Sequence, residues 1–277
     1  MKGGFWMIRT IKSGKVIEKS QFYVGEKKPR ARRRKGSSTL AKKDSNLRLA
    51  ERRLAQTINC NFAARDLFIT LTYDEEHMQA LGDDPVKGAE AAFGLFLRRL
   101  GRELGKIAIK PAFVWITADK DQDTLEPVRL HHHLIIKRAG FEVKRSGAKL
   151  EDVKIGGRKL EEIWRQGICY AEELAEQDDY LPLAVYMVRQ AVNAPDAKKW
   201  HPARGLAKPE IKSEIIVARA HELRAPGGAD VKEIGHYDIE TGSHYIRYVV
   251  PQGGRKGKDE KGKAKDRGTA GRGAPAV

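Results

Sequence analysis

The stretch Arg129-Leu-His-His-His-Leu-Ile-Ile136 decides the fold of this chain. It is an apolar run with branched residues between a loop and Lys137–Gly140, which is typical of a β-strand. Side chains alternate across a strand, so His131 and His133 should share one face, about 7 Å apart along the strand. Two imidazoles in this arrangement can chelate one divalent ion, although on this stretch alone solvated histidines are an equal alternative.

His132 should point to the opposite face of the same strand. Leu134 and Ile136 share that face because they follow at intervals of two residues. The face that carries His132 is therefore predicted to enter the hydrophobic core, and His132 is not expected to bind a metal.

The composition favours a polyanionic partner. The 277 residues include 53 Lys and Arg against 37 Asp and Glu, a formal net charge of +16, which is typical of proteins that bind nucleic acid or, less often, an anionic membrane surface. No apolar run approaches the length of a membrane span, and the first residues become polar too soon for a signal peptide. Cys60 and Cys169 form no CxxC pair, so a cytoplasmic protein without a disulfide framework is expected.

Two segments are strongly basic. Residues 27–35 read Lys-Lys-Pro-Arg-Ala-Arg-Arg-Arg-Lys, and residues 251–277 consist largely of Gly, Lys, Arg and Ala. The first is either a solvated arm or an arm that follows phosphates. The second has almost no apolar residue and is predicted to be disordered.

The remaining chain alternates between predicted strands and helices. Branched residues, apolar spacing and the positions of Pro and Gly predict two sets of elements. Strands are expected at 7–24 with a turn at Ser13-Gly14, at 66–73, 111–117, 168–174 and 215–218, and at 237–250 with a hinge at Thr241-Gly242. Helices are expected at 38–59, from 84 onward, at 160–164 and at 182–192.

These elements predict an α+β fold: a central antiparallel sheet of about five strands, with helices packed mainly on one face. Strands 112–118 and 129–137 should be neighbours, because two strands joined by a loop of this length pair most easily as antiparallel partners. Strand 67–73 should lie beside them, because sites on these strands would have to converge on one metal. The predicted organisation is an N-terminal region at 1–60, a central domain at 61–220, a C-terminal strand pair at 221–250 and a tail at 251–277.

Four features occur in order and together resemble a known family. They are Phe-Ile-Thr-Leu-Thr-Tyr at 68–73, an acidic segment near Asp119, His131-x-His133, and Tyr186 in Ala-Val-Tyr-Met-Val-Arg at 184–189. This series resembles the rolling-circle replication initiators of the HUH endonuclease superfamily, of the phage and plasmid replication-associated type. The segments Leu160–Trp164 and Arg204–Pro209 are also similar to that family, so the resemblance covers roughly residues 59–211.

The resemblance implies site-specific nicking and rejoining of single-stranded DNA at a replication origin. It implies Tyr186 as nucleophile, Arg189 as its basic neighbour, and Mg²⁺ or Mn²⁺ held by His131, His133 and Asp119. Imidazole ligands make Mn²⁺ at least as suitable as Mg²⁺. The DNA contacts expected from the matching segments are Thr70, Thr72, Arg129, Arg204 and Lys208. No helicase-type Gly-rich phosphate loop is present, so a helicase and a polymerase would come from the host.

Some assignments stay open at this stage. Ala118 stands where the family often has a metal-binding Glu, so the third ligand is Asp119, Asp121 or Glu126, or else an extra water. Tyr180 competes with Tyr186 as nucleophile, and Tyr186 could instead pack in the core. The alternatives for the whole chain are a catalytically inactive nucleic-acid-binding protein on the same sheet, or a relaxase or transposase of the same superfamily.

The basic arm at 27–35 and the basic tail, most of whose charge lies at 255–267, are expected to add non-specific affinity for DNA but little specificity, because phosphate contacts carry no sequence information. A truncation tests this role for the tail. Removing residues 251–277 should reduce the slope of log affinity for single-stranded DNA against log salt, because each phosphate-bound cation releases counterions. Fluorescence anisotropy between about 50 and 200 mM salt measures this slope. A slope equal to that of the full chain would show that the tail does not contact DNA.

Overall fold

The computed structural model describes residues 4–25, 40–121, 124–146, 149–192, 198–216, 223–235 and 243–250. The basic arm at 27–35, the tail at 251–277 and the predicted hinge at Thr241-Gly242 lie outside these ranges. No helix within them is long and apolar enough to cross a membrane.

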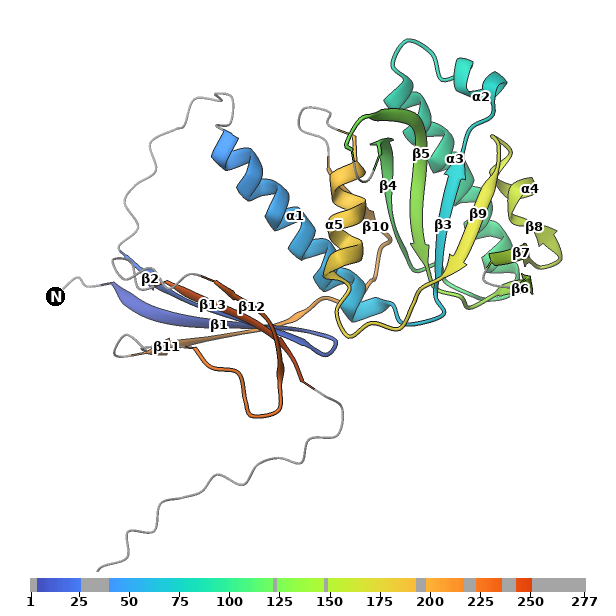
Figure 1. Ribbon diagram of the computed structural model, residues 1–277. Helices are drawn as coiled ribbons and strands as arrows, with labels where there is room; N and C mark the ends of the chain where they lie inside the picture. The colour runs from blue at the N-terminus through green and yellow to red at the C-terminus, as the bar shows by residue number, and fades with distance from the viewer. Residues whose placement is uncertain are drawn as a thin grey trace, which may run out of the picture.

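A five-stranded antiparallel sheet forms the centre of the larger lobe (Figure 1). Its strands are, in spatial order, β10 (His201–Pro202), β4 (Phe113–Lys120), β5 (Pro127–Ile136), β3 (Leu67–Thr72) and β9 (Cys169–Glu173). The α+β class and the five-stranded sheet are therefore confirmed. The histidine strand β5 pairs with β4 on one side and β3 on the other, as expected.

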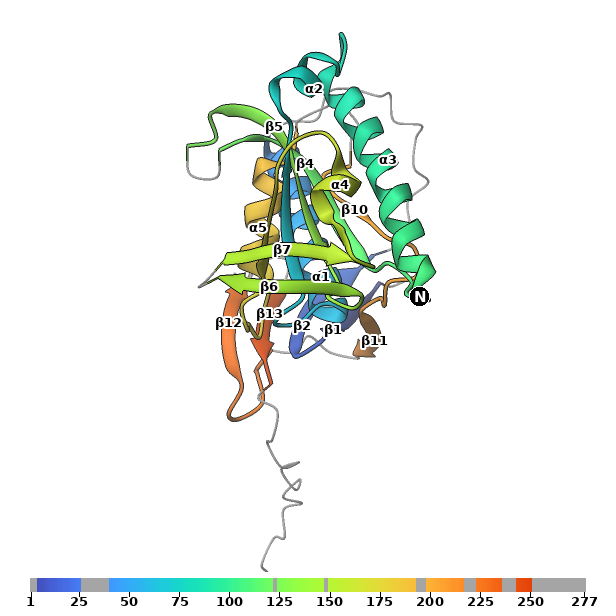
Figure 2. The ribbon, with the colours of Figure 1, turned by 90° about the vertical axis from the view of Figure 1, so that its right-hand side faces the viewer.

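Helices cover both faces of this sheet, whereas the sequence led us to expect them mainly on one. Helices α3 (Pro85–Lys106) and α4 (Leu160–Trp164) pack on one face, while α1 (Leu40–Asn61) and α5 (Leu181–Gln190) pack on the other (Figure 2). The physical reason lies in the strands, which are apolar on both sides. In β3, Leu67 joins the α3 side and Phe68 joins the α5 side, and both are buried.

His132 lies fully buried on the α3 side of the sheet, with Leu134 and Ile136, as predicted. Its Nε2 atom lies 2.7 Å from the hydroxyl of Tyr73, and its Nδ1 atom lies 3.2 Å from the hydroxyl of Thr117. Burial, together with the neighbouring histidines, lowers the pKa of His132 to about 3. The imidazole is therefore neutral at pH 7 and serves as a hydrogen-bonded core residue.

A second five-stranded antiparallel sheet lies beyond α1 and α5 (Figure 1). Its order is β11 (Glu210–Ile216), β1 (Phe5–Ser13), β2 (Val16–Val24), β13 (His244–Val249) and β12 (Asp230–Gly235). The turn at Gly14, with φ +59°, closes the predicted β1–β2 hairpin. The predicted strand start at Tyr237 lies outside the described residues, whereas β13 falls within the predicted span 237–250 and β12 precedes it. Segments on both sides of the predicted boundaries at 60 and 220 meet in this one sheet.

Helix α1 connects the two sheets. Leu54 and Ile58 on one side of it are buried against the central sheet. On its other side, Gln56 donates a hydrogen bond to Glu18 of β2, and Arg52 pairs with Glu233 of β12 at 2.8 Å. Because α1 is amphipathic, its apolar side packs into the core of the central sheet while its polar side forms hydrogen bonds and an ion pair with the second sheet.

The sequence did not predict a small third sheet. It consists of β6 (Phe141–Ser146), β7 (Lys149–Ile155) and β8 (Arg158–Lys159). Ile155 and Phe141 of this sheet are buried in the core on the α3 side, so the sheet extends that core. A short helix, α2 (Glu75–Gln79), follows β3 and is capped by the side chain of Asp74.

The buried neutral His132 predicts acid sensitivity. Its pKa is about 3 in the fold against 6.5 when exposed, so below pH 6.5 the unfolded chain takes up a proton that the folded chain does not. Stability is therefore lost as the pH falls, by roughly 2 kcal/mol from this residue between pH 7.5 and 5. His132→Gln should reduce the pH dependence of urea unfolding, measured with EDTA, by about that amount.

Leu134→Ala is the matched control, because Leu134 is buried on the same strand face but does not titrate. It should lower stability equally at both pH values. An unchanged pH dependence in His132→Gln would show that His132 does not resist protonation.

Candidate active site

His131 and His133 converge on the α5 side of the central sheet. Their Nε2 atoms are 3.1 Å apart. The Nδ1 atom of His131 donates to the backbone oxygen of Arg129 at 2.9 Å, which leaves a lone pair on Nε2. The Nδ1 atom of His133 lies 3.1 Å from the Thr70 hydroxyl, which can accept its proton and so free its Nε2 as well.

This pair fits a divalent metal ion. Metal–imidazole distances are about 2.0–2.1 Å, so one ion can reach two nitrogens that lie 3.1 Å apart. Burial, and to a lesser extent His131, lowers the pKa of His133 to about 3. Because ligand histidines must be neutral, no proton competes for this nitrogen near neutral pH.

Helix α5 brings Tyr186 and Gln190 to the histidine pair. The ring centroid of Tyr186 is 5.5 Å from that of His133 and 6.1 Å from that of Phe68. Gln190 is buried, its Oε1 atom lies 3.3 Å from His133 Nε2, and its amide nitrogen donates to the backbone oxygen of Tyr186. An amide oxygen is a suitable ligand for Mg²⁺ or Mn²⁺, so Gln190 can complete a three-ligand set.

Sequence reasoning missed Gln190 because it looked for a carboxylate beside the histidines. The available signal was the spacing of four residues between Tyr186 and Gln190, which places the two side chains on one helical face. Arg189, one residue earlier, points elsewhere.

None of the three carboxylates considered as third ligand forms a metal-binding group with the histidine pair in the described residues, and the identity of the third ligand stays a prediction. Within the described ranges, no group of three or more His, Cys, Asp and Glu side chains is close enough to hold a metal. Asp119 lies at an irregularity of β4, and its Oδ1 atom is buried without a hydrogen bond, 3.6 Å from Lys120 Nζ. Asp121 accepts hydrogen bonds from Thr124 in a turn, and Glu126 is exposed.

Arg189 forms an ion pair with Glu51 of α1, at 3.4 Å from Nε, and its side chain is 56% exposed. Two lysines lie closer to the end of α5. Lys120 donates to the backbone oxygen of Ala191, and Lys199 donates to those of Ala191 and Val192. Ala191 forms an isolated β-bridge with Ala118, and Ala118 pairs with His131. The two lysines therefore bring positive charge to the histidine end of the sheet.

Tyr180 is a poor candidate for a nucleophile. It precedes α5, is only 3% exposed, and its hydroxyl donates to the backbone oxygen of Ala175 at 3.1 Å. Burial raises the pKa of this phenol. Tyr186 is half-buried beside the histidine pair, and its role as nucleophile stays a prediction.

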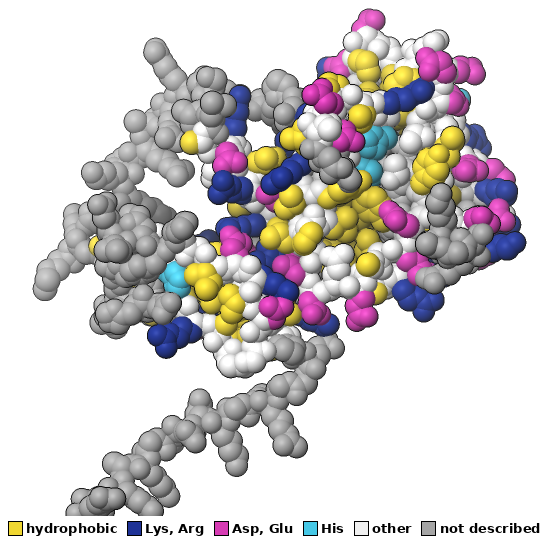
Figure 3. Space-filling model, in the orientation of Figure 1, with side chains coloured by type: hydrophobic (Ala, Val, Ile, Leu, Met, Phe, Trp, Pro, Cys, Tyr) yellow, Lys and Arg dark blue, Asp and Glu magenta, His cyan; other side chains and the backbone are white. Residues whose placement is uncertain are grey.

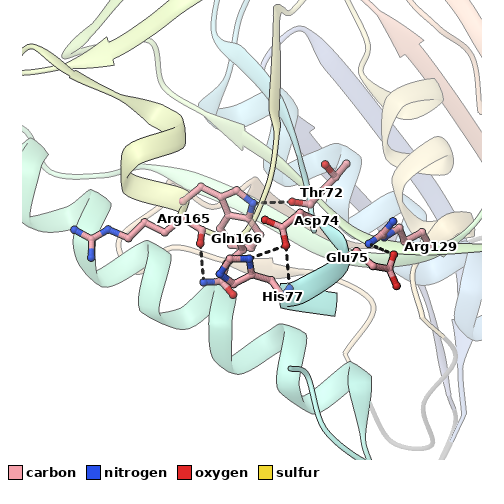
Figure 4. Close-up of polar contacts among 8 residues, drawn as sticks. Thr72, Asp74, Glu75, His77, Arg129, Arg165 and Gln166 are labelled. Atoms are coloured by element: carbon pink, nitrogen blue, oxygen red, sulfur yellow. Dashed lines mark hydrogen bonds and ion pairs between the residues drawn. The ribbon is translucent and has the colours of Figure 1, made fainter. Parts of the chain in front are cut away.

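The expected DNA contacts near the end of β3 lie around a polar cluster (Figure 4). Thr72 accepts a hydrogen bond from the indole of Trp164 through its backbone oxygen, at 2.8 Å. Arg129 pairs with Glu75 at 3.2 Å and remains 46% exposed. Thr72 pairs with His131 across the two strands, and the backbone oxygen of Arg129 accepts a hydrogen bond from His131, whereas the Thr70 hydroxyl contacts His133 directly.

Arg204 and Lys208 are exposed but lie at the opposite end of the strands. Ala203, next to Arg204, donates to the backbone oxygen of Phe113. Phe113 lies five residues before Ala118 on β4, and Ala118 is the residue that pairs with His131. Phe113 and Ala118 are therefore about 17 Å apart along the strand. These two residues are therefore not part of the histidine site.

Comparisons of this chain with models of protein families, with curated proteins and with solved structures found no match. The function of this chain is therefore inferred from the geometry of the site and from the motifs of the sequence.

Calorimetric titration with Mn²⁺ tests the ligand set. We expect His133→Ala to remove binding and Gln190→Ala to weaken it at least about tenfold, because each loses one donor. Asp119→Asn should bind Mn²⁺ like the wild type, since Asp119 has no contact with the histidines. Weaker binding by Asp119→Asn than by Gln190→Ala would show that the carboxylate, and not the amide, is the third ligand.

Proposed function

We propose that this chain initiates rolling-circle replication by nicking and rejoining single-stranded DNA, with Tyr186 as the nucleophile. The observation that carries this proposal is the juxtaposition on one sheet face of a helical tyrosine and two convergent imidazoles. The ring of Tyr186 lies 5.5 Å from that of His133, whose Nε2 atom faces that of His131 at 3.1 Å. The resemblance of the motifs to the HUH replication initiators supports the same reaction.

In the proposed reaction the Tyr186 hydroxyl oxygen attacks the scissile phosphorus. A bond forms between Oη and phosphorus, and the bond from phosphorus to the 3′ oxygen breaks. The phenol proton is lost to solvent or a base, and the departing 3′ oxygen takes up a proton. The products are a 5′-phosphotyrosine and a free 3′-OH, and the retained ester allows the strand to be rejoined without ATP.

The residues around Tyr186 have distinct proposed roles in this step. The rigid helix α5 aims the phenol at the sheet, since sites on helices are more precise than sites on loops. A divalent ion, Mg²⁺ or Mn²⁺, held by His131, His133 and Gln190 would polarise the scissile phosphate and offset its developing charge. Lys120 and Lys199 lie at the same end of the sheet and can attract the phosphate.

Arg189 is proposed to contact a phosphate next to the scissile one and not to supply a proton. Its guanidinium does not release a proton near neutral pH, and Nε already pairs with Glu51. Because its side chain is more than half exposed, its remaining nitrogens can contact a neighbouring phosphate. The proposed partners are single-stranded DNA at an origin and the helicase and polymerase of a bacterial host, in whose cytoplasm the chain would act.

The nucleophile is tested with a pool of random-sequence single-stranded DNA in the presence of Mn²⁺. A label on the 3′ end should migrate with the protein on a denaturing gel, whereas a label on the 5′ end should not, because the covalent bond is to the downstream fragment. Tyr186→Phe keeps the ring and removes only the hydroxyl. It should abolish the adduct and leave folding and DNA binding unchanged.

Tyr180→Phe is the matched control and should retain the adduct. If Tyr186→Phe keeps the adduct and Tyr180→Phe loses it, the assignment of the nucleophile is wrong. If wild-type protein binds the DNA without forming any adduct, the chain is a binding protein and not a nicking enzyme.

A further inference from the structure

The row of side chains that starts at the histidine pair continues across the sheet to an exposed tyrosine. Thr70 of β3 pairs with His133 on one side and with Tyr170 of β9 on the other. Residues paired across neighbouring strands point to the same face, so His133, Thr70 and Tyr170 share one face. Adjacent strands lie about 4.8 Å apart, which places Tyr170 about 10 Å from His133 at the backbone.

This half of the sheet face is open. Helix α5 packs against β4 and α1, whereas Thr70 and Thr72 of β3 are half-buried. Tyr170 is 59% exposed, the highest value for an aromatic side chain in the described residues, and Ile168 beside it is 52% exposed. Figure 3 shows histidine surface on the side of the molecule that faces the viewer, with hydrophobic, basic and acidic side chains near it.

An exposed aromatic ring beside a proposed phosphate site suits one kind of ligand. Nucleic-acid bases stack on aromatic side chains whatever their identity, because each base has a π-face. Glu172 lies two residues after Tyr170 on the same face and is exposed. The negative charge of Glu172 repels phosphates from its part of β9. We therefore expect the DNA backbone to pass on the other side of Tyr170, near Thr72 and Ile168.

We propose that Tyr170 stacks on a base of single-stranded DNA close to the scissile phosphate and so positions the strand at the histidine pair. This proposal rests on the proposed function, because it takes the histidine pair as the place where the phosphate binds. Tyr170 would be a positioning residue. The open threonine surface between Tyr170 and His133 would accommodate the sugar and phosphate that connect the stacked base to the site.

The test compares two probes, fluorescein-labelled (dT)16 and a 16-mer composed of abasic sites, by fluorescence anisotropy without metal. Tyr170→Ala should weaken (dT)16 binding about 5- to 150-fold, the range for loss of one stacked base, and should change abasic binding less than about twofold. Tyr170→Phe retains the ring and should bind like the wild type, whereas Tyr170→Leu should resemble Tyr170→Ala. Tyr23→Ala is the matched control, because Tyr23 is 51% exposed on the second sheet, and it should bind (dT)16 normally.

The outcomes separate this inference from the proposed function. Equal losses for (dT)16 and abasic DNA in Tyr170→Ala, or a loss in Tyr170→Phe as large as in Tyr170→Ala, would overturn the stacking role even if the Tyr186 adduct forms. Base-dependent loss together with no adduct would support stacking and overturn nicking. Failure of the wild type to bind (dT)16 would overturn both.

Discussion

Strand β5 is hydrogen-bonded on both sides, to β4 and to β3, and this constraint determines the rest of the site. A strand held in this way can direct its side chains only to one face or the other. Three successive histidines must therefore separate: His132 enters the core on the α3 side, while His131 and His133 meet on the α5 side. The contact of His132 with the Tyr73 hydroxyl fixes this register, because a shift by one residue would bury the two other imidazoles instead.

The polar contacts around the second sheet explain how α5 is held in place. Arg247 of β13 is fully buried and pairs with Asp179, just before α5, and Asp179 also accepts the backbone N–H of Leu181 at the start of the helix. Asn59 of α1 donates to the same carboxylate. Breaking a buried ion pair leaves an uncompensated charge, so this cluster ties the start of α5, the helix that carries Tyr186, to α1 and to the second sheet.

The site combines a rigid and an open half. On one side α5 supplies Tyr186 and Gln190, which are held by packing and by hydrogen bonds to neighbouring groups. On the other side β3 and β9 present threonines and Tyr170 to solvent. This division suits a substrate that must be aligned accurately at one phosphate, while its bases vary along the remaining strand.

The sequence by itself determined the strand that carries the histidines, their separation between two faces, the pairing of this strand with the one that precedes it in the chain, and the helix of Tyr186. These features depend on local periodicity and on short connections, which are legible in one chain. Only the tertiary structure decided that helices cover both faces, that Gln190 and not a nearby carboxylate faces His133, and that β11 joins the N-terminal strands. Such contacts join residues far apart in sequence, and their geometry is set by how whole elements pack.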